Sequence, residues 1–178
     1  MIETFNFLQI GQLKSINELV AATKVFDDTK WVSFVDRKVA RGIAAENTDT
    51  IPLLYDPKSI SPVRHGDFYT FEPFIDEVNS ACATVFGDCV VKQAMITRLR
   101  SGVCIPRHKD KGPITAKTHR VHVAIYTNND CWFTVNDESI NMLPGEIWAI
   151  DNVGKYHSVS NGGDTARVHL IVDLLAVA

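Results

Sequence analysis

The chain has 178 residues, 46% of them hydrophobic and 22% charged, and a formal net charge of -3 at pH 7. This length suits one domain with a sizeable core, two domains would be cramped, and the charged content disfavours a disordered chain. The small negative charge and the lack of a basic stripe in the sequence argue against a nucleic-acid partner.

The four cysteines and the N-terminal sequence bear on the expected compartment. Cys82, Cys89, Cys104 and Cys131 form no Cys-x-x-Cys pair, which disfavours a zinc knuckle. The N-terminal residues contain no positively charged start and no long apolar run, and no stretch approaches the roughly 20 apolar residues of a membrane span. We therefore expect reduced thiols in a cytoplasmic protein without a membrane partner.

Residues 1–88 are expected to form a mixed scaffold of helices and a short strand. A short helix is predicted over SINELVAATKVF, residues 15–26, and TIPLLYD, residues 50–56, is a strand candidate. The strongest helix prediction is FYTFEPFIDEVNSACATVFG, residues 68–87, because its apolar positions recur every three or four residues. Gly87 stands where such a helix would end.

From residue 89 onward the pattern changes to short strands separated by turns. The predicted strands are CVVKQAMITRLR (89–100), RVHVAIYTN (120–128), GEIWAID (145–151) and ARVHLIVDLL (166–175), with a hairpin over CWFTVNDESINML (131–143). Several short strands over about 90 residues indicate a sandwich or a small barrel. The chain is therefore expected to be mainly β.

Two of these strands carry an Arg-x-His pair on an otherwise apolar background. Because side chains alternate along a strand, Arg120 and His122 share one face of the first, and Arg167 and His169 share one face of the second. One interpretation is a sheet with one solvated side. The other is a barrel whose polar mouth binds an anion.

RHKDKG, residues 107–112, contains two candidate metal ligands, His108 and Asp110. Non-haem iron(II) oxygenases bind the metal with two histidines and one carboxylate on one face. The third ligand is expected from a distant histidine near the end of the β region, and His157 in NVGKYHSVSN has that place. Since His-x-Asp is common by chance, the prediction depends on all three residues.

An arginine downstream of His157 fits the cosubstrate of such an enzyme. 2-Oxoglutarate carries two carboxylates, and a buried carboxylate is costly unless it is paired, best with a planar guanidinium. Arg167 follows His157 by ten residues on the next predicted strand, a spacing that this enzyme class uses, and Arg120 and His122 are further donors. Candidate substrate contacts are Arg100, Arg107 and His169.

Together these segments resemble the aspartyl/asparaginyl β-hydroxylase-like family of iron(II)/2-oxoglutarate oxygenases, over roughly residues 90–175. The matching pieces are IPRHKD, THRVHVAIYTN, PGEIWAID, the pair His157 and Arg167, and the ending HLIVDLL. The resemblance implies a double-stranded β-helix of the jelly-roll or cupin type, with N-terminal helices packed on it. It also implies a set of site residues: iron ligands His108, Asp110 and His157, Arg167 on the distal carboxylate of 2-oxoglutarate, and Arg120 and His122 near the cosubstrate.

The resemblance implies a dioxygenase that uses iron(II), 2-oxoglutarate and dioxygen to hydroxylate an aliphatic carbon of an amino acid or peptidyl residue, of the aspartyl/asparaginyl or prolyl type. With Asp110, the sequence resembles the bacterial small-molecule branch of the family more closely, because the vertebrate peptidyl hydroxylases of the family lack this carboxylate. A small molecule or a short peptide is the expected substrate, and no catalytic residue is expected beyond the metal centre. Residues 1–178 would form one oxygenase domain, with the metal-binding β core in residues 89–178. Two alternatives remain, a cupin-type metal enzyme that does not use 2-oxoglutarate and a non-catalytic barrel.

Overall fold

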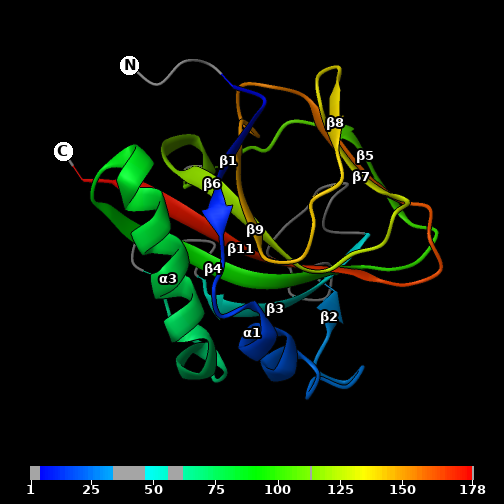
Figure 1. Ribbon diagram of the computed structural model, residues 1–178, viewed down its shortest axis with the longest axis horizontal. Coiled ribbons are helices and arrows are strands. Elements are labelled where there is room, and N and C mark those ends of the chain that lie inside the picture. Colours follow the sequence, from blue (N-terminus) through cyan, green and yellow to red (C-terminus); the bar gives the residue numbers. More distant parts are fainter. Residues whose placement is uncertain (1–4, 34–46, 56–61, 113, 178) are drawn as a thin grey trace.

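The computed structural model describes residues 5–33, 47–55, 62–112 and 114–177. Within them, two antiparallel sheets lie opposite each other. Figure 1 shows helices α1 (Ile16–Thr23) and α3 (Phe68–Phe86) on the side of the larger sheet that faces away from the smaller sheet. A short 3-10 turn, η2 (Thr115–Lys117), precedes one central strand. The prediction of a mainly β chain with N-terminal helices packed on it is confirmed.

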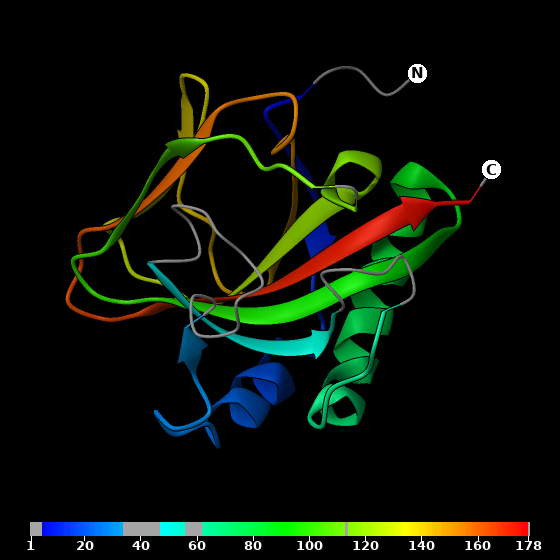
Figure 2. The same cartoon turned by 180° about the vertical axis from the view of Figure 1, so that it is seen from behind.

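The larger sheet has seven strands, and strands from both ends of the chain contribute to it. In spatial order they are β1 (Phe7–Gln12), β9 (Glu146–Ile150), β6 (His119–Tyr126), β11 (Arg167–Ala176), β4 (Cys89–Leu99), β3 (Thr48–Leu54) and β2 (Val32–Ser33). Figure 2 shows β6, β11 and β4 side by side in its centre. The scaffold region and the β core therefore share one sheet.

The smaller sheet has four strands and closes the other side of the barrel. Its spatial order is β5 (Cys104–His108), β10 (His157–Asn161), β7 (Cys131–Val135) and β8 (Glu138–Ile140). The sequence predicted the hairpin of β7 and β8 but neither β5 nor β10. Both are only five residues long and rich in polar residues, and β5 contains a proline, so neither has the apolar alternation of a typical strand.

The helix predictions agree with the structure except at one boundary. α3 ends at Phe86, and Gly87 follows it with a positive φ of 75°, a conformation that glycine adopts without a side-chain clash. α1 ends at Thr23, three residues before the predicted end. The strand predicted over residues 50–56 corresponds to β3, and its last residue, Asp56, lies outside the described residues.

The large sheet separates two apolar clusters. Its outer face packs against the helices, where Leu170 and Val172 of β11 meet Phe71 and Val78 of α3 in one buried cluster. A second cluster fills part of the space between the sheets and includes Phe133 of β7. Burying the helix-side face supplies most of the apolar contact, so the inner face can carry polar groups.

The inner face of β11 decides between the two interpretations of the Arg-x-His strands. Arg167, His169 and Asp173 are all buried, with relative exposures of 5%, 1% and 0%, and His122 of the neighbouring strand β6 is 4% exposed. The polar side of the sheet is therefore inside the barrel and not in solvent. The interpretation as a barrel with a polar interior is the correct one.

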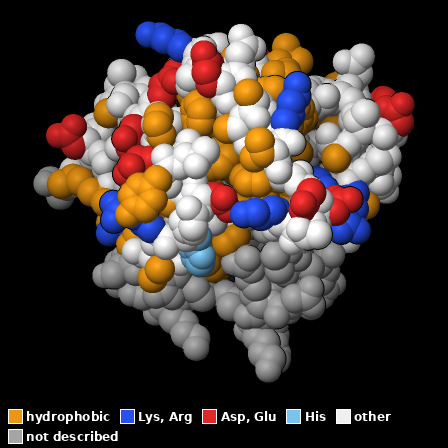
Figure 3. All heavy atoms as spheres, turned by 90° about the horizontal axis from the view of Figure 1, so that it is seen from below, with side chains coloured by type: hydrophobic (Ala, Val, Ile, Leu, Met, Phe, Trp, Pro, Cys, Tyr) orange, Lys and Arg blue, Asp and Glu red, His pale blue; other side chains and the backbone are white. Residues whose placement is uncertain are grey.

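On the face that Figure 3 shows, acidic and basic side chains of the described residues are interspersed rather than gathered into a basic stripe. No helix in the part of the chain that the structure describes is long and apolar enough to span a membrane.

Candidate metal centre and cosubstrate pocket

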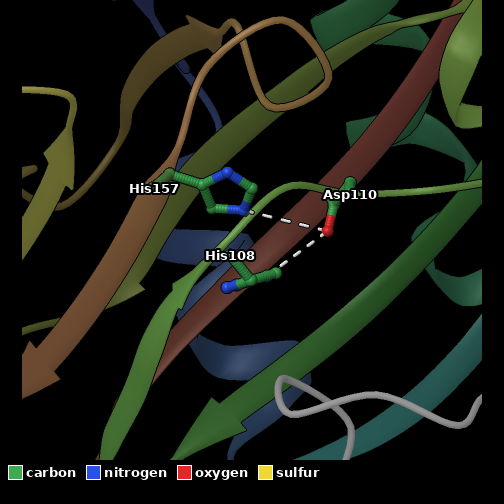
Figure 4. Close-up of side chains that lie close together, drawn as sticks. All are labelled: His108, Asp110 and His157. Carbon is green, nitrogen blue, oxygen red and sulfur yellow. Dashed lines mark ion pairs between the residues drawn. The ribbon is translucent and has the colours of Figure 1, made fainter.

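Three predicted ligands converge inside the barrel. His108 ends β5, His157 begins β10, and the two are direct cross-strand partners, so their side chains lie on the same face. Asp110 follows His108 by two residues, and one ligand atom from each of the three lies within 4.8 Å of the others. Figure 4 shows Asp110 Oδ1 facing both rings, 3.4 Å from Nε2 of His108 and 3.8 Å from Nε2 of His157.

Backbone carbonyls orient the two imidazole rings. Nδ1 of His108 is 2.7 Å from the carbonyl oxygen of Pro106, and Nδ1 of His157 has a longer contact of 3.5 Å with that of Lys155. A ring nitrogen facing a carbonyl carries a proton, so in a neutral ring Nε2 keeps a lone pair that a metal can use. In a protonated His108 ring, Nε2 also carries a proton and donates it to Asp110. Two imidazole nitrogens and one carboxylate oxygen form a donor set that fits iron(II).

Asp110 is held in the ionised form that a metal ligand needs. Burial favours its neutral form, but the Arg120 guanidinium and hydrogen bonds from His108 and Asn152 outweigh burial and hold the pKa of Asp110 well below its usual range. The hydrogen bond to Asp110 raises the pKa of His108, whereas burial lowers the pKa of His157.

Arg167 projects into the barrel from β11 without an anionic partner. Its Nη2 lies 2.8 Å from Nδ1 of His169, and its guanidinium lies 5.7 Å from the ring centroid of Phe133. No carboxylate among the described residues is within ion-pair distance of it, and burial lowers the pKa of Arg167 to about 10. A buried charge without a counter-ion is costly, so the geometry fits a site for an anion from solution.

His122 and His169 add unpaired polar atoms to the same interior. Both nitrogens of His122 and Nε2 of His169 are buried and have no hydrogen-bond partner in the described part of the molecule. The two rings lie 5.6 Å apart, and burial lowers the pKa of both well below the ordinary value, so both are neutral. Each buried unpaired polar atom costs about 1–3 kcal/mol, which a ligand with acceptor oxygens would recover.

Arg120, predicted to lie near the cosubstrate, is paired with two carboxylates. It donates from Nε and Nη2 to the two oxygens of Asp173, both at 2.8 Å, and from Nη1 to Asp110 at 2.5 Å. These two carboxylates take three of its five N–H groups. The structure therefore places Arg120 beside the predicted metal ligands.

The predicted substrate contacts lie in three different places. Arg100 makes a two-point ion pair with Asp49 of β3. Arg107 precedes His108 on β5, so it points to the opposite side of the strand, where its guanidinium lies 5.0 Å from the ring centroid of Tyr156. His169 alone lies in the barrel interior, beside Arg167.

Sequence reasoning missed two residues of this centre, Asn152 and Asp173. Asp173 shares the inner face of β11 with Arg167 and His169, so strand alternation was a signal that could have found it. Asn152 lies in the turn after β9, where nothing in the local sequence indicates a role.

Solved structures of low sequence identity share the fold of this chain. A prolyl hydroxylase from Trichoplax adhaerens, in complex with a hypoxia-inducible factor peptide fragment, has 12% identity and a TM-score of 0.63, covering 98% of this chain and 86% of its own. The viral collagen prolyl hydroxylase of Paramecium bursaria Chlorella virus-1 has 9% identity and a TM-score of 0.60, covering 99% and 98%. A 2OG-Fe(II) oxygenase family oxidoreductase from Burkholderia pseudomallei has 13% identity and a TM-score of 0.62, covering 73% and 67%. The likeness confirms the predicted jelly-roll fold.

The chain belongs to the aspartyl/asparaginyl β-hydroxylase family, whose model matches residues 73–176. This confirms the family that the sequence resembles, and with it the prediction of a 2-oxoglutarate-dependent dioxygenase of the hydroxylase type. The match includes the three clustered residues His108, Asp110 and His157 together with Arg167. It favours an oxygenase over the cupin-type metal enzyme and the non-catalytic barrel.

Proposed function

We propose that this protein hydroxylates an aliphatic carbon of a free amino acid or a short peptide, using iron(II), 2-oxoglutarate and dioxygen. The observation that carries the proposal is the buried Arg167, which has no counter-ion among the described residues of the barrel that also holds the His-Asp-His cluster. His108, Asp110 and His157 would hold the iron. Arg167 would pair with the distal carboxylate of 2-oxoglutarate.

The protein's own groups bind, orient and exclude water. When bound, iron(II) and 2-oxoglutarate supply the oxidising chemistry, in which dioxygen and 2-oxoglutarate are consumed and succinate, carbon dioxide and the hydroxylated product are formed. Because Nη2 of Arg167 donates to Nδ1 of His169, the proton of this neutral ring sits on Nε2 and is free for a carboxylate. The apolar ring of Phe133 lies beside the guanidinium of Arg167 and would help to exclude water from that end of the pocket.

His122 and Arg120 would bind the cosubstrate at the end nearer the metal. His122 is neutral and has no partner among the described residues, so it donates one hydrogen bond without adding charge. Asp173 and Asp110 take three of the five N–H groups of Arg120, and a further N–H of this guanidinium would point to the cosubstrate. This arrangement would give the two carboxylates of 2-oxoglutarate different partners and thereby set its direction in the pocket.

Asp110 and two of the similar structures inform the choice of substrate. The carboxylate at Asp110 resembles the bacterial small-molecule branch, which favours a free amino acid. Two of the structures with the same fold are prolyl hydroxylases, one of them bound to a peptide fragment, which keeps a short peptide in the proposal. A substrate screen should therefore begin with proline and acidic amino acids, free and in short peptides.

The test is anaerobic visible spectroscopy of the protein with iron(II) and 2-oxoglutarate, followed by succinate formation after dioxygen is admitted with candidate substrates. We expect a weak charge-transfer band for the wild type, its loss in Arg167→Ala, and its retention in Arg64→Ala. Arg64 is a suitable control because it is an exposed arginine that lies over Phe68, outside the barrel interior. Failure of the wild type to bind iron, or iron binding without the band, would overturn the proposal.

A further inference from the structure

The two carboxylate oxygens of Asp110 have different surroundings. Oδ1 faces the Nε2 atoms of His108 and His157. Oδ2 points the other way and accepts two hydrogen bonds, from Nη1 of Arg120 at 2.5 Å and from Nδ2 of Asn152 at 2.7 Å. The protein thus occupies one oxygen and leaves the other directed at the imidazoles.

Asn152 holds Asp110 at two points. Its side-chain amide donates to Oδ2, and its backbone carbonyl accepts the N–H of Asp110 at 2.9 Å. The side chain of Asn152 is buried, with a relative exposure of 2%, in the turn between β9 and β10. Since β10 begins at His157, Asn152 links the segment that carries Asp110 to the turn that leads into another ligand.

The contact from Arg120 alone would not determine the orientation of this carboxylate. Arg120 donates from Nη1 to Oδ2, but its guanidinium is also bound at two points by Asp173, and its full charge attracts both oxygens of Asp110. Asn152 is neutral, and its amide N–H is a directional donor that reaches Oδ2 only. The amide therefore adds a second directional bond to Oδ2 and, together with Nη1 of Arg120, determines which oxygen faces the two histidines.

We propose that Asn152 is a positioning residue, which holds Oδ2 of Asp110 so that the metal is bound through Oδ1 alone. This rests on the proposed function, because it assigns a task relative to the iron held by His108, Asp110 and His157. Without the amide, the carboxylate can rotate and present both oxygens, and the geometry of the donor set changes. Loss of such an outer partner of a metal ligand typically lowers metal affinity about 10–100-fold.

The experiment compares Asn152→Leu with Asn141→Leu, using cobalt(II) alone as the probe. Leucine keeps the branched shape of asparagine, with bulkier methyl groups, and removes the hydrogen bonds of its side chain. Asn141 is a matched control because it also donates one side-chain hydrogen bond, at 2.8 Å to the backbone of Asn128, on the hairpin side of the barrel. Affinity is measured by competition with a chromophoric chelator, and the visible d–d spectrum of bound cobalt(II) reports the geometry of its ligands.

We expect Asn152→Leu to lower cobalt(II) affinity about 10–100-fold and to alter the d–d spectrum, while Asn141→Leu matches the wild type in both. The thermal midpoint of each metal-free variant shows whether it is folded. If Asn152→Leu does not fold, Asn152→Ala is measured in the same way. An unchanged affinity and spectrum in a folded Asn152 variant would overturn the inference.

A double variant separates positioning from general structure. In the Asp110→Ala background, the further change Asn152→Leu should have no effect on cobalt(II) affinity, because its action passes through the Asp110 carboxylate. An equal loss in both backgrounds would contradict the inference. If the wild type binds no cobalt(II), or if the His108→Ala variant binds it as tightly as the wild type, the proposed function fails and this inference fails with it. Normal wild-type binding with a silent Asn152→Leu would remove the inference alone.

Discussion

Two arginines on neighbouring strands enter the barrel and meet opposite environments. Arg120 on β6 is bound by the carboxylates of Asp173 and Asp110, whereas Arg167 on β11 contacts His169 and Phe133 and no carboxylate among the described residues. Burial disfavours the charged form of both. The two carboxylates nevertheless raise the pKa of Arg120, while burial lowers the pKa of Arg167 to about 10.

Arg120 forms ion pairs within the fold, whereas the surroundings of Arg167 fit a site that takes an anionic ligand. A buried arginine with its carboxylates in place costs little, because the attraction offsets the loss of hydration. A buried arginine without them reduces the stability of the empty protein and is retained where a ligand supplies the missing charge. In the proposed function, Arg120 therefore supports Asp110, and Arg167 would line the pocket for the cosubstrate.

The largest expected effect comes from removing the paired arginine. Arg120→Met leaves the half-buried Asp110 and the fully buried Asp173 without their counter-ion, and breaking a buried pair from one side typically costs about 3–5 kcal/mol. Urea denaturation of the metal-free protein measures the free energy of unfolding. A loss below about 1 kcal/mol would mean that the two carboxylates do not depend on Arg120 as the geometry indicates.

The matched change at the other arginine should have the opposite effect on stability. Arg167→Met removes an uncompensated buried charge, so the metal-free variant should be as stable as the wild type or more stable. Its affinity for 2-oxoglutarate should fall by about 2–5 kcal/mol, measured by calorimetry with iron(II) under anaerobic conditions. Equal destabilisation by Arg167→Met and Arg120→Met would remove the distinction between the two arginines.

The unpaired region should also give the metal-free protein a characteristic pH dependence. The pKa values of His122 and His169 lie well below the ordinary value in the folded protein, and the unfolded chain takes up protons below a pH of about 6.5. Stability is therefore full above that pH and falls below it, by about 1.4 kcal/mol per pH unit for each histidine. His119 and His157 shift in the same direction, and His108, whose pKa is raised, acts oppositely.

Urea denaturation at several pH values between 7.5 and 5.5 measures this slope. His122→Leu should make the slope shallower by about one proton, because one buried neutral histidine no longer distinguishes the folded from the unfolded state. An identical slope in the wild type and in His122→Leu would show that His122 is solvated or paired.

The strands that carry the two arginines could be predicted from the sequence, but the partners of the arginines could not. The apolar periodicity of α3 and the alternation along β6 and β11 depend on neighbouring residues, so the helix and the two Arg-x-His strands could be predicted. The partners of an arginine depend on strand register. Arg120 and its main partner Asp173 are 53 residues apart and meet because β6 and β11 pair at these positions.

At the candidate site, the three clustered residues were predicted from the sequence, whereas Asn152 was missed. The known pattern of two histidines and one carboxylate allowed us to predict that His108, Asp110 and His157 lie together. Asn152 belongs to no such pattern, and its contact with Asp110 exists only once the turn after β9 is placed against the end of β5. Which of several arginines faces inward is likewise decided by the face of its strand and by its partner.

The smallest expected effect concerns Arg107, a predicted substrate contact on the strand that ends in His108. Its side chain points away from the barrel interior and lies over Tyr156, an exposed ring that Lys109 also contacts at 4.9 Å. An exposed cation–π contact is worth about 0.5–1 kcal/mol, so Arg107→Ala should cost no more than this in urea denaturation. Once a substrate is identified, its KM decides between the two roles of Arg107. A raised KM with unchanged kcat would support the substrate contact, whereas an unchanged KM is expected from its position on the outer side of β5.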